Sequence, residues 1–498
     1  MKNYLSKISI LILLVIVVSC VSEIPFSKLP EIEKKLTPLQ LLLAEKAVKS
    51  VDENNPVAIH KFTADPCVLV YNDTVYVYGS NDHQQAEECW SEHHDDYSCI
   101  NTLNIFSSKD LVNWTDCGEI VVAGKNGAAK WANNSWAPAI ACKRINGKDK
   151  FFLYFADNGS GIGVLTSDSP TGPFIDPLGK QLISRSTPNT EGVVWLFDPA
   201  VFVDDDETGY LYYGGGHHDN NPQHPNSARC VKLGDDMISL AGTPVIIDAP
   251  YLFEDSGINK INDKYVYSYC SNWASREGES DDVPPAAVIA YMVSDSPLGP
   301  FEYSGWTLKN PGEYFGAYGN NHHWMFEYKN KWYIAYHAQT VQKMIGYENT
   351  TSRSLFINEI NINADGTLPV QNVTMAGCTK TADFIPNGEI PAATFHSYKN
   401  VAVTYDQNVL PISSNAYLLI KNVDLSKAGS KLTVDVTEES TGIIKFVADK
   451  PFGGKVIAEI NLVNGNNVGL NIPSSLKNVH DLYIVFDGEI ELKSWLMD

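Results

Sequence analysis

The protein has 498 residues, of which 44% are hydrophobic and 19% charged, and its formal net charge at pH 7 is −22. This length exceeds what one compact core usually holds, so it predicts a large domain accompanied by a smaller one. The composition is that of a globular chain and excludes a largely disordered one. The negative charge disfavours nucleic acid as a partner, because a polyanion is repelled, and it suits a neutral substrate.

The N-terminal residues have the pattern of a targeting segment. Lys2 and Lys7 precede an apolar run over residues 8–18, which is followed by Ser19-Cys20. A basic start, a short apolar core and a small residue before the cleavage point are typical of a secretory signal, and the run is too short for a comfortable membrane span. The ending Val-Val-Ser-Cys resembles a bacterial lipobox. It predicts that residues 1–20 are a lipoprotein signal peptide and that Cys20 is lipidated. The exported protein would then be anchored to a bacterial membrane, on the periplasmic side or at the cell surface, and would contact the membrane only through this lipid. A plain signal peptide cut nearby is the alternative.

Residues 21–55 are predicted to form a tether with one short helix, because leucines and alanines share one side of "PLQLLLAEKAVK". From residue 56 to 380 the chain is predicted to consist of strands, since aromatic-rich runs such as "DTVYVYGS" and "NKWYIAYHAQ" follow turn residues. The segments "TSDSPTGPF" and "VSDSPLGPF" nearly repeat. A recurring unit of roughly 60 residues suggests propeller blades, about five over this length, with a central channel. A pair of β-sandwiches is the alternative, although it does not explain the repeat.

After a Pro- and Gly-containing linker, residues 385–498 alternate again as strands and are predicted to form a β-sandwich. The fold class predicted for the whole chain is therefore all-β, a five-bladed β-propeller followed by a β-sandwich.

Eight cysteines follow Cys20, and an exported protein meets an oxidising environment in which some can pair. Cys89 and Cys99 flank an acidic loop and are the pair to test first. Cys67, Cys142 and Cys270 fall in strand-like runs and are expected to be small buried apolar residues.

Three acidic residues occupy similar settings at the starts of predicted strands. Asp65 lies in "FTADP", Asp198 in "FDPAVF" and Glu254 in "YLFEDSG". An Asp-Pro taken singly is most simply a turn residue. Three such acids in order along a repeating fold predict carboxylates that converge on one centre, which is what hydrolysis of a glycosidic bond requires.

These motifs, with "SWAPAI", "GNNHHWMF" and "SRSLFINEININADGTLP", make residues 56–380 resemble the family 43 glycoside hydrolases, most of all their arabinoxylan-debranching arabinofuranosidases. The resemblance implies a five-bladed β-propeller and hydrolysis with inversion at the anomeric carbon. It implies that Asp65 is the general base, Glu254 the general acid, and Asp198 the residue that orients Glu254 and raises its pKa. Asp255, where relatives often carry Gly or Ala, is expected to point away.

The resemblance also implies a calcium ion near the channel centre, held by His322 and waters, and no organic cofactor. A histidine that positions the sugar or a catalytic acid is the alternative, because calcium prefers oxygen ligands. His323 is predicted to contact substrate, as are Gln339 and Arg353, whose guanidinium would anchor carboxylates. Trp136 is predicted to stack on the sugar, with a core tryptophan as the alternative.

Two loops rich in histidine are further candidates. The loop over residues 87–99, which includes His93 and His94, could suggest a metal, but its ligands lack a fixed spacing and a solvated loop is the simpler interpretation. The loop over residues 214–226 is predicted to form part of the rim, with a glycine run that lets the backbone approach a ligand.

Residues 392–498 more loosely resemble a family 6 carbohydrate-binding module, with Tyr405, Tyr417 and Trp495 as the visible aromatic residues. A structural role is the alternative to sugar binding there. The predicted function is removal of α-L-arabinofuranosyl side groups from arabinoxylan or related plant cell-wall polysaccharides such as arabinan and xylan. A β-xylosidase or dual-activity enzyme is the nearest alternative and an endo-arabinanase a third. A non-catalytic, glycan-binding surface lipoprotein is the alternative from a different class.

Overall fold

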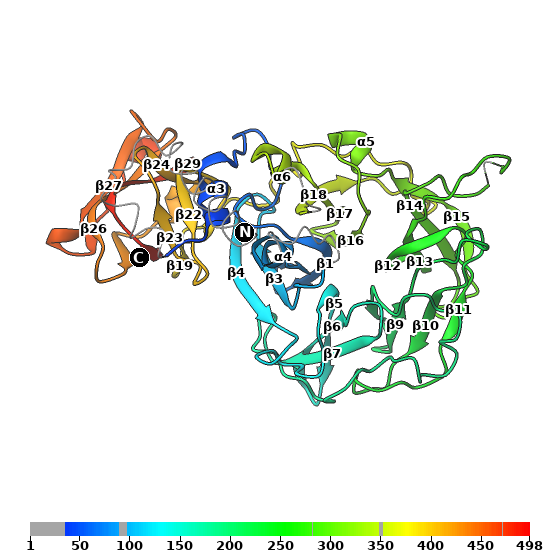
Figure 1. Ribbon diagram of the computed structural model, residues 1–498. Helices are drawn as coiled ribbons and strands as arrows, with labels where there is room; N and C mark the ends of the chain where they lie inside the picture. Colours follow the sequence, from blue (N-terminus) through cyan, green and yellow to red (C-terminus); the bar gives the residue numbers. More distant parts are fainter. Residues whose placement is uncertain (1–34, 89–96, 281, 348–351, 471) are drawn as a thin grey trace, which may run out of the picture. The chain divides into compact units, whose positions relative to one another are not determined.

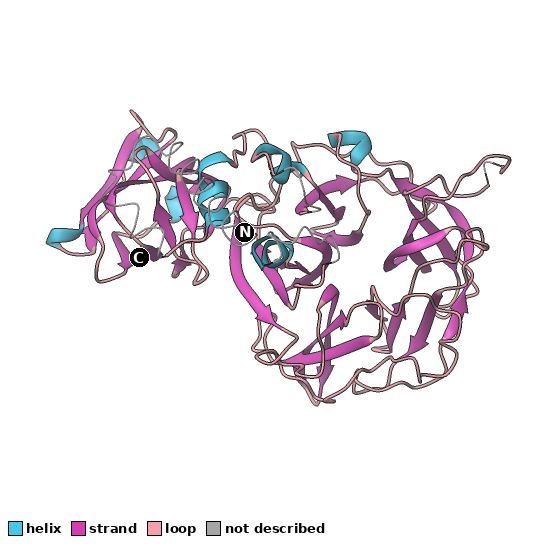
Figure 2. Cartoon of the chain, viewed as in Figure 1, coloured by secondary structure: helices cyan, strands magenta, loops and turns pink. Residues whose placement is uncertain are grey.

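A computed structural model describes residues 35–88, 97–280, 282–347, 352–470 and 472–498. The chain divides into two compact units. The large unit comprises residues 47–384 and 394–397, and the small unit comprises residues up to 46, 385–393 and 398–498. Strands dominate both units, which confirms the all-β prediction (Figure 2).

The large unit contains five antiparallel sheets, in each of which strands that are consecutive in the chain are paired. The sheets are β1 (Ala64–Tyr71), β2 (Thr74–Ser80), β3 (Thr102–Ser108), β4 (Trp114–Val121) and β20 (Thr394–Phe395); β5 (Trp136–Ile145), β6 (Lys148–Ala156) and β7 (Ile162–Ser167); β8 (Ala200–Val203), β9 (Gly209–Tyr213), β10 (Ala228–Lys232) and β11 (Val245–Ile247); β12 (Leu252–Ile261), β13 (Lys264–Ser271), β14 (Ile289–Ser294) and β15 (Glu302–Leu308); β16 (His323–Tyr328), β17 (Lys331–Ala338) and β18 (Ser354–Ile360). Short helices α4 (Asp82–Glu88), α5 (Gly312–Phe315) and α6 (Thr340–Met344) lie between strands.

Tight turns connect the first two strands in four of these sheets. The turns Asn72-Asp73, Asn146-Gly147, Asn262-Asp263 and Lys329-Asn330 have positive φ at both residues. Two-residue turns of this kind match the right-handed twist of the strands they join, and Asn, Asp and Gly adopt them most easily. The turn residues thus explain why aromatic runs separated by two polar residues fold as hairpins.

The first strands of the five sheets contact one another in cyclic order. β1 contacts β5, β5 contacts β8, β8 contacts β12, β12 contacts β16, and β16 contacts β1. Figure 1 shows the five sheets following one another around a ring. The start of each first strand is therefore placed near the same central region.

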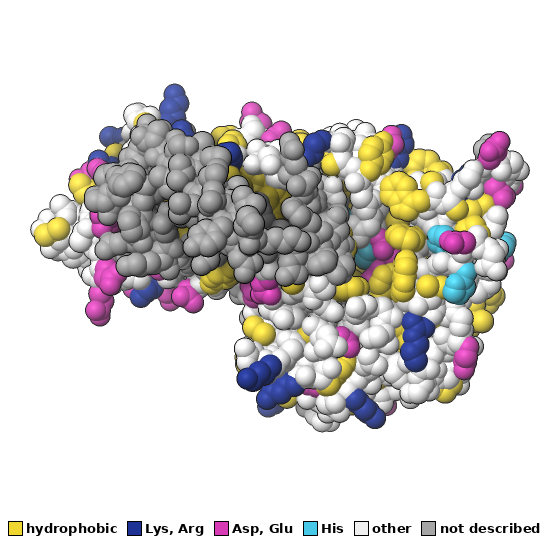
Figure 3. Space-filling view, in the orientation of Figure 1, with side chains coloured by type: hydrophobic (Ala, Val, Ile, Leu, Met, Phe, Trp, Pro, Cys, Tyr) yellow, Lys and Arg dark blue, Asp and Glu magenta, His cyan; other side chains and the backbone are white. Residues whose placement is uncertain are grey.

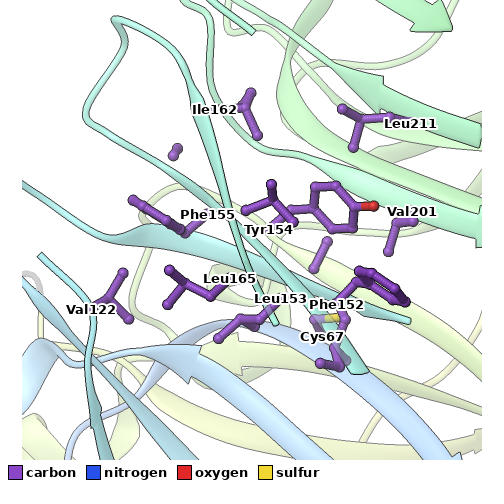
Figure 4. Close-up of a cluster of buried hydrophobic side chains, with 14 of the residues drawn as sticks. Cys67, Val122, Phe152, Leu153, Tyr154, Phe155, Ile162, Leu165, Val201 and Leu211 are labelled. Carbon is purple, nitrogen blue, oxygen red and sulfur yellow. The ribbon is translucent and has the colours of Figure 1, made fainter. Parts of the chain in front are cut away.

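Apolar side chains between neighbouring sheets hold the ring together. One buried cluster joins Cys67 of β1 to Phe152 and Tyr154 of β6 and to Val201 and Leu211 of β8 and β9 (Figure 4). The free thiols of Cys67 and Cys270 are fully buried and Cys142 is partly buried, in line with their predicted packing role.

The small unit contains two antiparallel sheets and the helix α3 (Pro38–Lys46). The strands are β19 (Ile390–Pro391), β22 (Val401–Val403), β23 (Val409–Pro411), β25 (Lys431–Val436), β28 (Asn467–Gly469) and β30 (Leu492–Met497) in one sheet, and β21 (Ser397–Lys399), β24 (Ala416–Asp424), β26 (Thr441–Ala448), β27 (Lys455–Asn461) and β29 (Val479–Glu489) in the other. Single-turn 3-10 helices cover Leu425–Lys427, Leu462–Asn464 and Ser474–Leu476.

The helix predicted within the tether packs on the small unit. Leu36 and Ala44 join a buried cluster with Ala402, Leu410 and Ile412. Trp495 is 1% exposed, so it is a core residue of this unit and not a surface aromatic. Within the described residues, none of the helices is long and apolar enough to cross a membrane. The predicted signal peptide and Cys20 lie outside the described residues.

A buried ionic cluster in the large unit makes a prediction about stability. Asp116 on β4 lies 3.0 Å from His60 Nε2 and 3.1 Å from Lys61 Nζ, and all three residues are buried. Burial raises the pKa of Asp116, but Lys61 and His60 outweigh it and hold this pKa well below its ordinary value. The resulting stability is present above the unfolded-state pKa, about 3.9, and is lost as the pH falls toward the folded-state pKa.

We therefore expect Asp116→Asn to lower the free energy of unfolding by about 3 kcal/mol at pH 7, because Lys61 then lacks this buried carboxylate. Urea unfolding followed by tryptophan fluorescence should show the difference from wild type shrinking below about pH 4. Asp149→Asn, at an exposed carboxylate bonded to Tyr71, is the control and should change the value by less than about 0.5 kcal/mol. Equal effects of the two substitutions would contradict the prediction.

Candidate active site

The first strands of the five sheets each place one predicted site residue near the centre of the ring. Asp65 lies at the start of β1 and Trp136 at the start of β5, Asp198 precedes β8, Glu254 lies at the start of β12, and His322 precedes β16. Because these strand starts surround one central region, residues separated by more than 250 positions in the sequence become neighbours.

A repeated backbone turn presents two of the acids. Asp65, Ala137 and Asp198 each precede a proline and have positive φ angles of 49°, 38° and 48°. The pairing register shifts around this turn in β1 and in β5. Positive φ is uncommon for residues other than glycine, and such strained positions cluster at functional sites.

His322 lies at the centre of the acidic group. Its Nδ1 is 3.6 Å from Asp65 Oδ1, and its Nε2 is 3.3 Å from Asp198 Oδ2 and 3.5 Å from Glu254 Oε1. All four residues are buried. Burial lowers the pKa of His322, but Asp65, Asp198 and Asp255 together raise it well above its ordinary value. The structure thus brings His322 and all three predicted catalytic acids together, and the imidazole ring separates Asp65 from Glu254.

Asp65 is held as a carboxylate by a dense set of donors. Its Oδ1 accepts a hydrogen bond from Arg353 Nη1 at 2.8 Å, and its Oδ2 accepts one from Ser80 Oγ at 2.6 Å. Burial by itself raises the pKa of Asp65, but Arg353 and His322 outweigh it and hold this pKa far below its ordinary value. These contacts therefore favour the charged form of Asp65.

His337 of β17 supports the same residue. Its Nδ1 accepts the backbone N–H of Asp65 at 3.1 Å, and its Nε2 lies 3.0 Å from the carbonyl oxygen of Asn320. These partners fix the neutral tautomer with the proton on Nε2, in agreement with the lowered pKa of His337, which burial causes.

Arg353 is fixed by Asp82, the first residue of α4. Its Nε and Nη2 donate to the two oxygens of Asp82 at 2.8 and 2.9 Å, which is the bidentate arrangement that suits a guanidinium. The ring of Tyr97 lies 4.5 Å from Arg353 Cζ. The predicted role of Arg353 as an anchor for carboxylates thus has a direct structural basis. Sequence reasoning missed Asp82, His337 and Ser80, because nothing in their local patterns signals contacts made across the ring.

Asp198 and Glu254 form the opposite half of the site. Asp198 Oδ2 accepts the backbone N–H of Asp255 at 2.9 Å. Burial raises the pKa of Asp198 to about 8, with added repulsion from Glu254 and Asp65 and an opposing attraction from His322. Within the described part of the chain, Glu254 Oε1 is buried and has no hydrogen-bond partner. This half of the site thus combines a carboxyl group whose burial favours the protonated form with a buried carboxyl oxygen that has no hydrogen bond among the described residues.

Two residues differ from their predictions. Asp255 does not point away: it is 3% exposed, and its Oδ1 lies 3.6 Å from His322 Nδ1. The His323 ring is buried between Asp255 Oδ2 at 2.5 Å and Ser268 Oγ at 2.8 Å. Both ring nitrogens already have protein partners, so His323 supports Asp255 and cannot be the predicted contact with substrate.

The remaining predicted contacts lie around this centre. Trp136 is partly buried, and its Nε1 donates to the carbonyl oxygen of Tyr97 at 3.0 Å. Gln339 precedes α6 and is 9% exposed, and its amide packs against Gly319, where a Cβ atom would lie only 2.7 Å from Nε2. Its role as a contact for substrate stays a prediction.

The two histidine-rich loops differ in what the structure describes. His93, His94 and Cys89 lie outside the described residues, whereas Cys99 is disulfide-bonded. In the second loop the glycine run lies close to the strand of Glu254 and not to a ligand. A Cβ atom on Gly215 would lie 2.5 Å from the carbonyl oxygen of Phe253 and 3.3 Å from Glu254 Cα. This run allows the loop to pack against the strand that carries Glu254.

Exposed aromatic side chains of the large unit include Trp195, Trp273 and Tyr318. The Trp195 ring contacts Phe197 and Phe253, the neighbours of Asp198 and Glu254, at centroid distances of 5.3 and 5.6 Å. Figure 3 shows hydrophobic side chains beside histidine and acidic side chains on one face of this unit. An aromatic surface next to the acids suits a sugar, whose ring stacks on such side chains.

The buried acids and His322 also have the composition of a metal site. Asp198, Glu254 and His322 offer ligand atoms that all lie within 4.8 Å of one another. The separations of 3.3 and 3.5 Å between His322 Nε2 and the carboxylate oxygens suit adjacent ligands of an ion with metal–oxygen distances of about 2.3–2.6 Å. The residues present could therefore bind a metal ion.

Comparison with known proteins agrees with this geometry. The profile of the glycosyl hydrolases family 43 matches residues 54–368. The chain is 43% identical over 471 residues to an arabinoxylan arabinofuranohydrolase of Paenibacillus polymyxa, covering 89% of this chain and 74% of that protein. It is 43% identical over 477 residues to an arabinoxylan arabinofuranohydrolase of Bacillus subtilis, covering 88% and 90%.

Among solved structures, the chain resembles the family 43 arabinoxylan arabinofuranohydrolase from Bacillus subtilis in complex with cellotetraose. The TM-score is 0.82 and the identity 40%, and the match covers 91% of this chain and 99% of that one. The match to the family profile spans more than half of the sequence and contains Asp65, Asp198, Glu254 and His322. The chain therefore belongs to the glycosyl hydrolases family 43.

Proposed function

We propose that this protein is an inverting α-L-arabinofuranosidase that removes arabinofuranosyl side groups from arabinoxylan or a related hemicellulose. The observation that carries the proposal is the convergence of three buried carboxyl groups on His322, with Asp65 at one ring nitrogen and Glu254 at the other. The choice of sugar is supported by the two relatives that are 43% identical, both arabinoxylan arabinofuranohydrolases.

In the proposed reaction Asp65 is the general base. Its charge is maintained by Arg353 and Ser80, so it can accept a proton from a water molecule that attacks the anomeric carbon. Glu254 is the general acid and gives its proton to the departing glycosidic oxygen. An inverting enzyme needs about 6.5–9.5 Å between these carboxyl groups to accommodate the water.

Asp198 keeps the proton near Glu254. Asp198 and Glu254 do not readily ionise together, because two negative charges in a buried site repel each other. Arg353, Trp136 and Gln339 are proposed to contact the bound sugar. Arg353 has the clearest basis, because it is fixed beside Asp65 and its guanidinium suits sugar hydroxyls.

The test compares hydrolysis of aryl α-L-arabinofuranosides with that of aryl β-D-xylosides, followed by arabinoxylan with NMR detection of the first-formed anomer. Release of arabinose with inverted configuration is expected. Preferential cleavage of the xyloside would favour the xylosidase alternative, and an anomer of retained configuration would overturn the mechanism. Binding to the polymer without any release would indicate a non-catalytic glycan-binding protein.

We also propose that the five sheets are the blades of a five-bladed β-propeller, supported by the cyclic contacts of their first strands. The small unit is proposed to be a β-sandwich of the family 6 carbohydrate-binding type. Its two sheets and a hollow of about 810 Å³ lined in part by the exposed Phe452 support this assignment. Affinity electrophoresis of residues 385–498 in gels containing xylan or arabinan tests sugar binding.

We further propose that His322 gives up a ring proton and holds a calcium ion, with carboxylate oxygens and waters as the other ligands. Such an ion would supply positive charge among the buried acids. Adding calcium to chelator-treated protein is expected to raise its melting temperature, since a ligand that binds only the folded state stabilises it. The shift should be absent in His322→Gln. Equal melting temperatures of wild type with and without calcium would exclude the ion.

Finally, we propose that the protein is exported and anchored to a bacterial membrane by a lipid on Cys20. The proposal is supported by the signal-like residues 1–20 alone. Radiolabelled palmitate should enter the wild-type protein and not Cys20→Ala. Equal labelling of the two would contradict it.

A further inference from the structure

A chain of three buried side chains lies directly behind the acidic centre. Asp255 Oδ2 is 2.5 Å from His323 Nδ1, and His323 Nε2 is 2.8 Å from Ser268 Oγ. The backbone N–H of His323 also donates to both oxygens of Asp255, at 3.2 and 3.1 Å. Asp255 is 3% exposed, His323 1% and Ser268 0%. Although these are the residue types of a serine hydrolase, no substrate can reach a sealed Ser268 hydroxyl, so the chain has another use.

The Asp255–His323 bonds connect the strand that carries Glu254 with the strand that follows His322. Asp255 follows Glu254 on β12, and His323 follows His322 at the start of β16. The side-chain and backbone bonds between Asp255 and His323 hold in place the two backbone segments that carry Glu254 and His322. The bonds between Asp255 and His323 therefore set where Glu254 and His322 point.

Asp255 also reaches the third acid. Its backbone N–H donates to Asp198 Oδ2 at 2.9 Å, and its φ of 70° belongs to the left-handed region. The pairing of β12 with β13 shifts register on both sides of Glu254. A strand interrupted in this way needs contacts other than its ladder to stay in place, and the side chain of Asp255 supplies them.

Gly257 leaves space for the contact between Ser268 and His323. It pairs with Ser268 across β12 and β13. A Cβ atom at this position would lie 2.5 Å from Ser268 Oγ and 3.1 Å from His323 Nε2. A glycine here therefore permits the close contact of Ser268 with His323.

We propose that Asp255, His323 and Ser268 are positioning residues that hold Glu254 in the orientation needed to protonate the leaving group. The inference rests on the proposed role of Glu254 as general acid. It assigns to Asp255 and His323 a part in the proton-donating half of the reaction and none in contacting the sugar.

The test uses aryl α-L-arabinofuranosides whose leaving groups differ in how much they need protonation by the general acid. A 2,4-dinitrophenolate departs without protonation, whereas 4-methoxyphenolate needs the acid. Asp255→Asn and His323→Gln are expected to lower kcat/KM about 10–100-fold on the 4-methoxyphenyl substrate, the usual size of an effect on a supporting residue, and only a few-fold on the dinitrophenyl substrate. Ser268→Ala and Gly257→Ala should show the same bias to a smaller degree.

The ratio of the two rates does not depend on how much of the enzyme is folded, so partial misfolding of a variant does not disguise the result. Asp116→Asn alters another buried Asp–His pair of the same unit, Asp116 with His60, and should leave the ratio unchanged. Equal losses on both substrates, or no loss, in Asp255→Asn and His323→Gln would overturn the inference.

Glu254→Gln separates this inference from the proposed function. If Glu254→Gln shows the bias and the Asp255 and His323 variants do not, the positioning role fails and the general acid stands. If Glu254→Gln itself shows no bias, Glu254 is not the general acid and both proposals fail.

Discussion

Replacing Asp65 with asparagine should lower kcat on an aryl arabinofuranoside by about 10²–10⁴-fold, the usual contribution of a general base. Asparagine keeps the size of the side chain and can still accept a hydrogen bond from Ser80, but it cannot take a proton from water. The loss should fall mainly on kcat, because water activation is needed in the transition state more than in binding. Because attack by water is needed whatever group departs, the loss should be similar for good and poor leaving groups.

The substitution also changes the charge around Arg353. Arg353 keeps its bidentate contact with Asp82, so it should stay in place when Asp65 becomes neutral. Titration calorimetry with an arabinoxylan oligosaccharide measures whether binding survives. Asp149→Asn, an exposed position in the same unit, serves as the matched control. Turnover by Asp65→Asn within a few-fold of wild type would remove Asp65 from the role of base.

Replacing Glu254 with glutamine should lower kcat/KM by a similar factor of about 10²–10⁴ on arabinoxylan, but by much less on the dinitrophenyl substrate. Glutamine cannot donate a proton of comparable acidity to the glycosidic oxygen. It fits the space of a carboxyl group whose Oε1 already lacks a hydrogen-bond partner within the described residues. The protein should therefore fold normally, and circular dichroism should match that of the wild type.

The dependence on the leaving group is the decisive measurement for Glu254. Rates plotted against the pKa of the departing phenol should be nearly flat for the wild type and steep for Glu254→Gln. In Asp65→Asn the plot should keep the wild-type slope at a lower level. If the slopes of the two variants were exchanged, the assignments of acid and base would have to be exchanged as well.

The positions of the three acids could be predicted from the sequence because each is marked by the residues next to it. Asp65-Pro and Asp198-Pro each precede an aromatic strand, and "FEDSG" precedes another, so their place at strand starts could be predicted from neighbouring residues. The repeat then placed these starts near one centre. His322 was predicted from the motif around it, and the structure places it between the acids.

The supporting residues could not be predicted in the same way. The sequence does not reveal that Asp255 turns toward His322, or that it bonds to His323, whose other ring nitrogen meets Ser268. The two register shifts beside Glu254 are backbone features that leave no clear pattern in the sequence. Asp82 contacts Arg353 across 271 positions, and such long-range pairs depend on the closing of the ring.

The turn shared by Asp65, Ala137 and Asp198 has a consequence for how this fold changes activity. Three sheets adopt one backbone conformation at corresponding points, and in one of them alanine replaces the acid. A carboxylate can therefore be gained or lost there by a single substitution that leaves the path of the chain unaltered. The limit is electrostatic, since each added negative charge needs a buried cation such as Arg353. The number and placement of acids, and with them the reaction, can therefore differ while the framework persists.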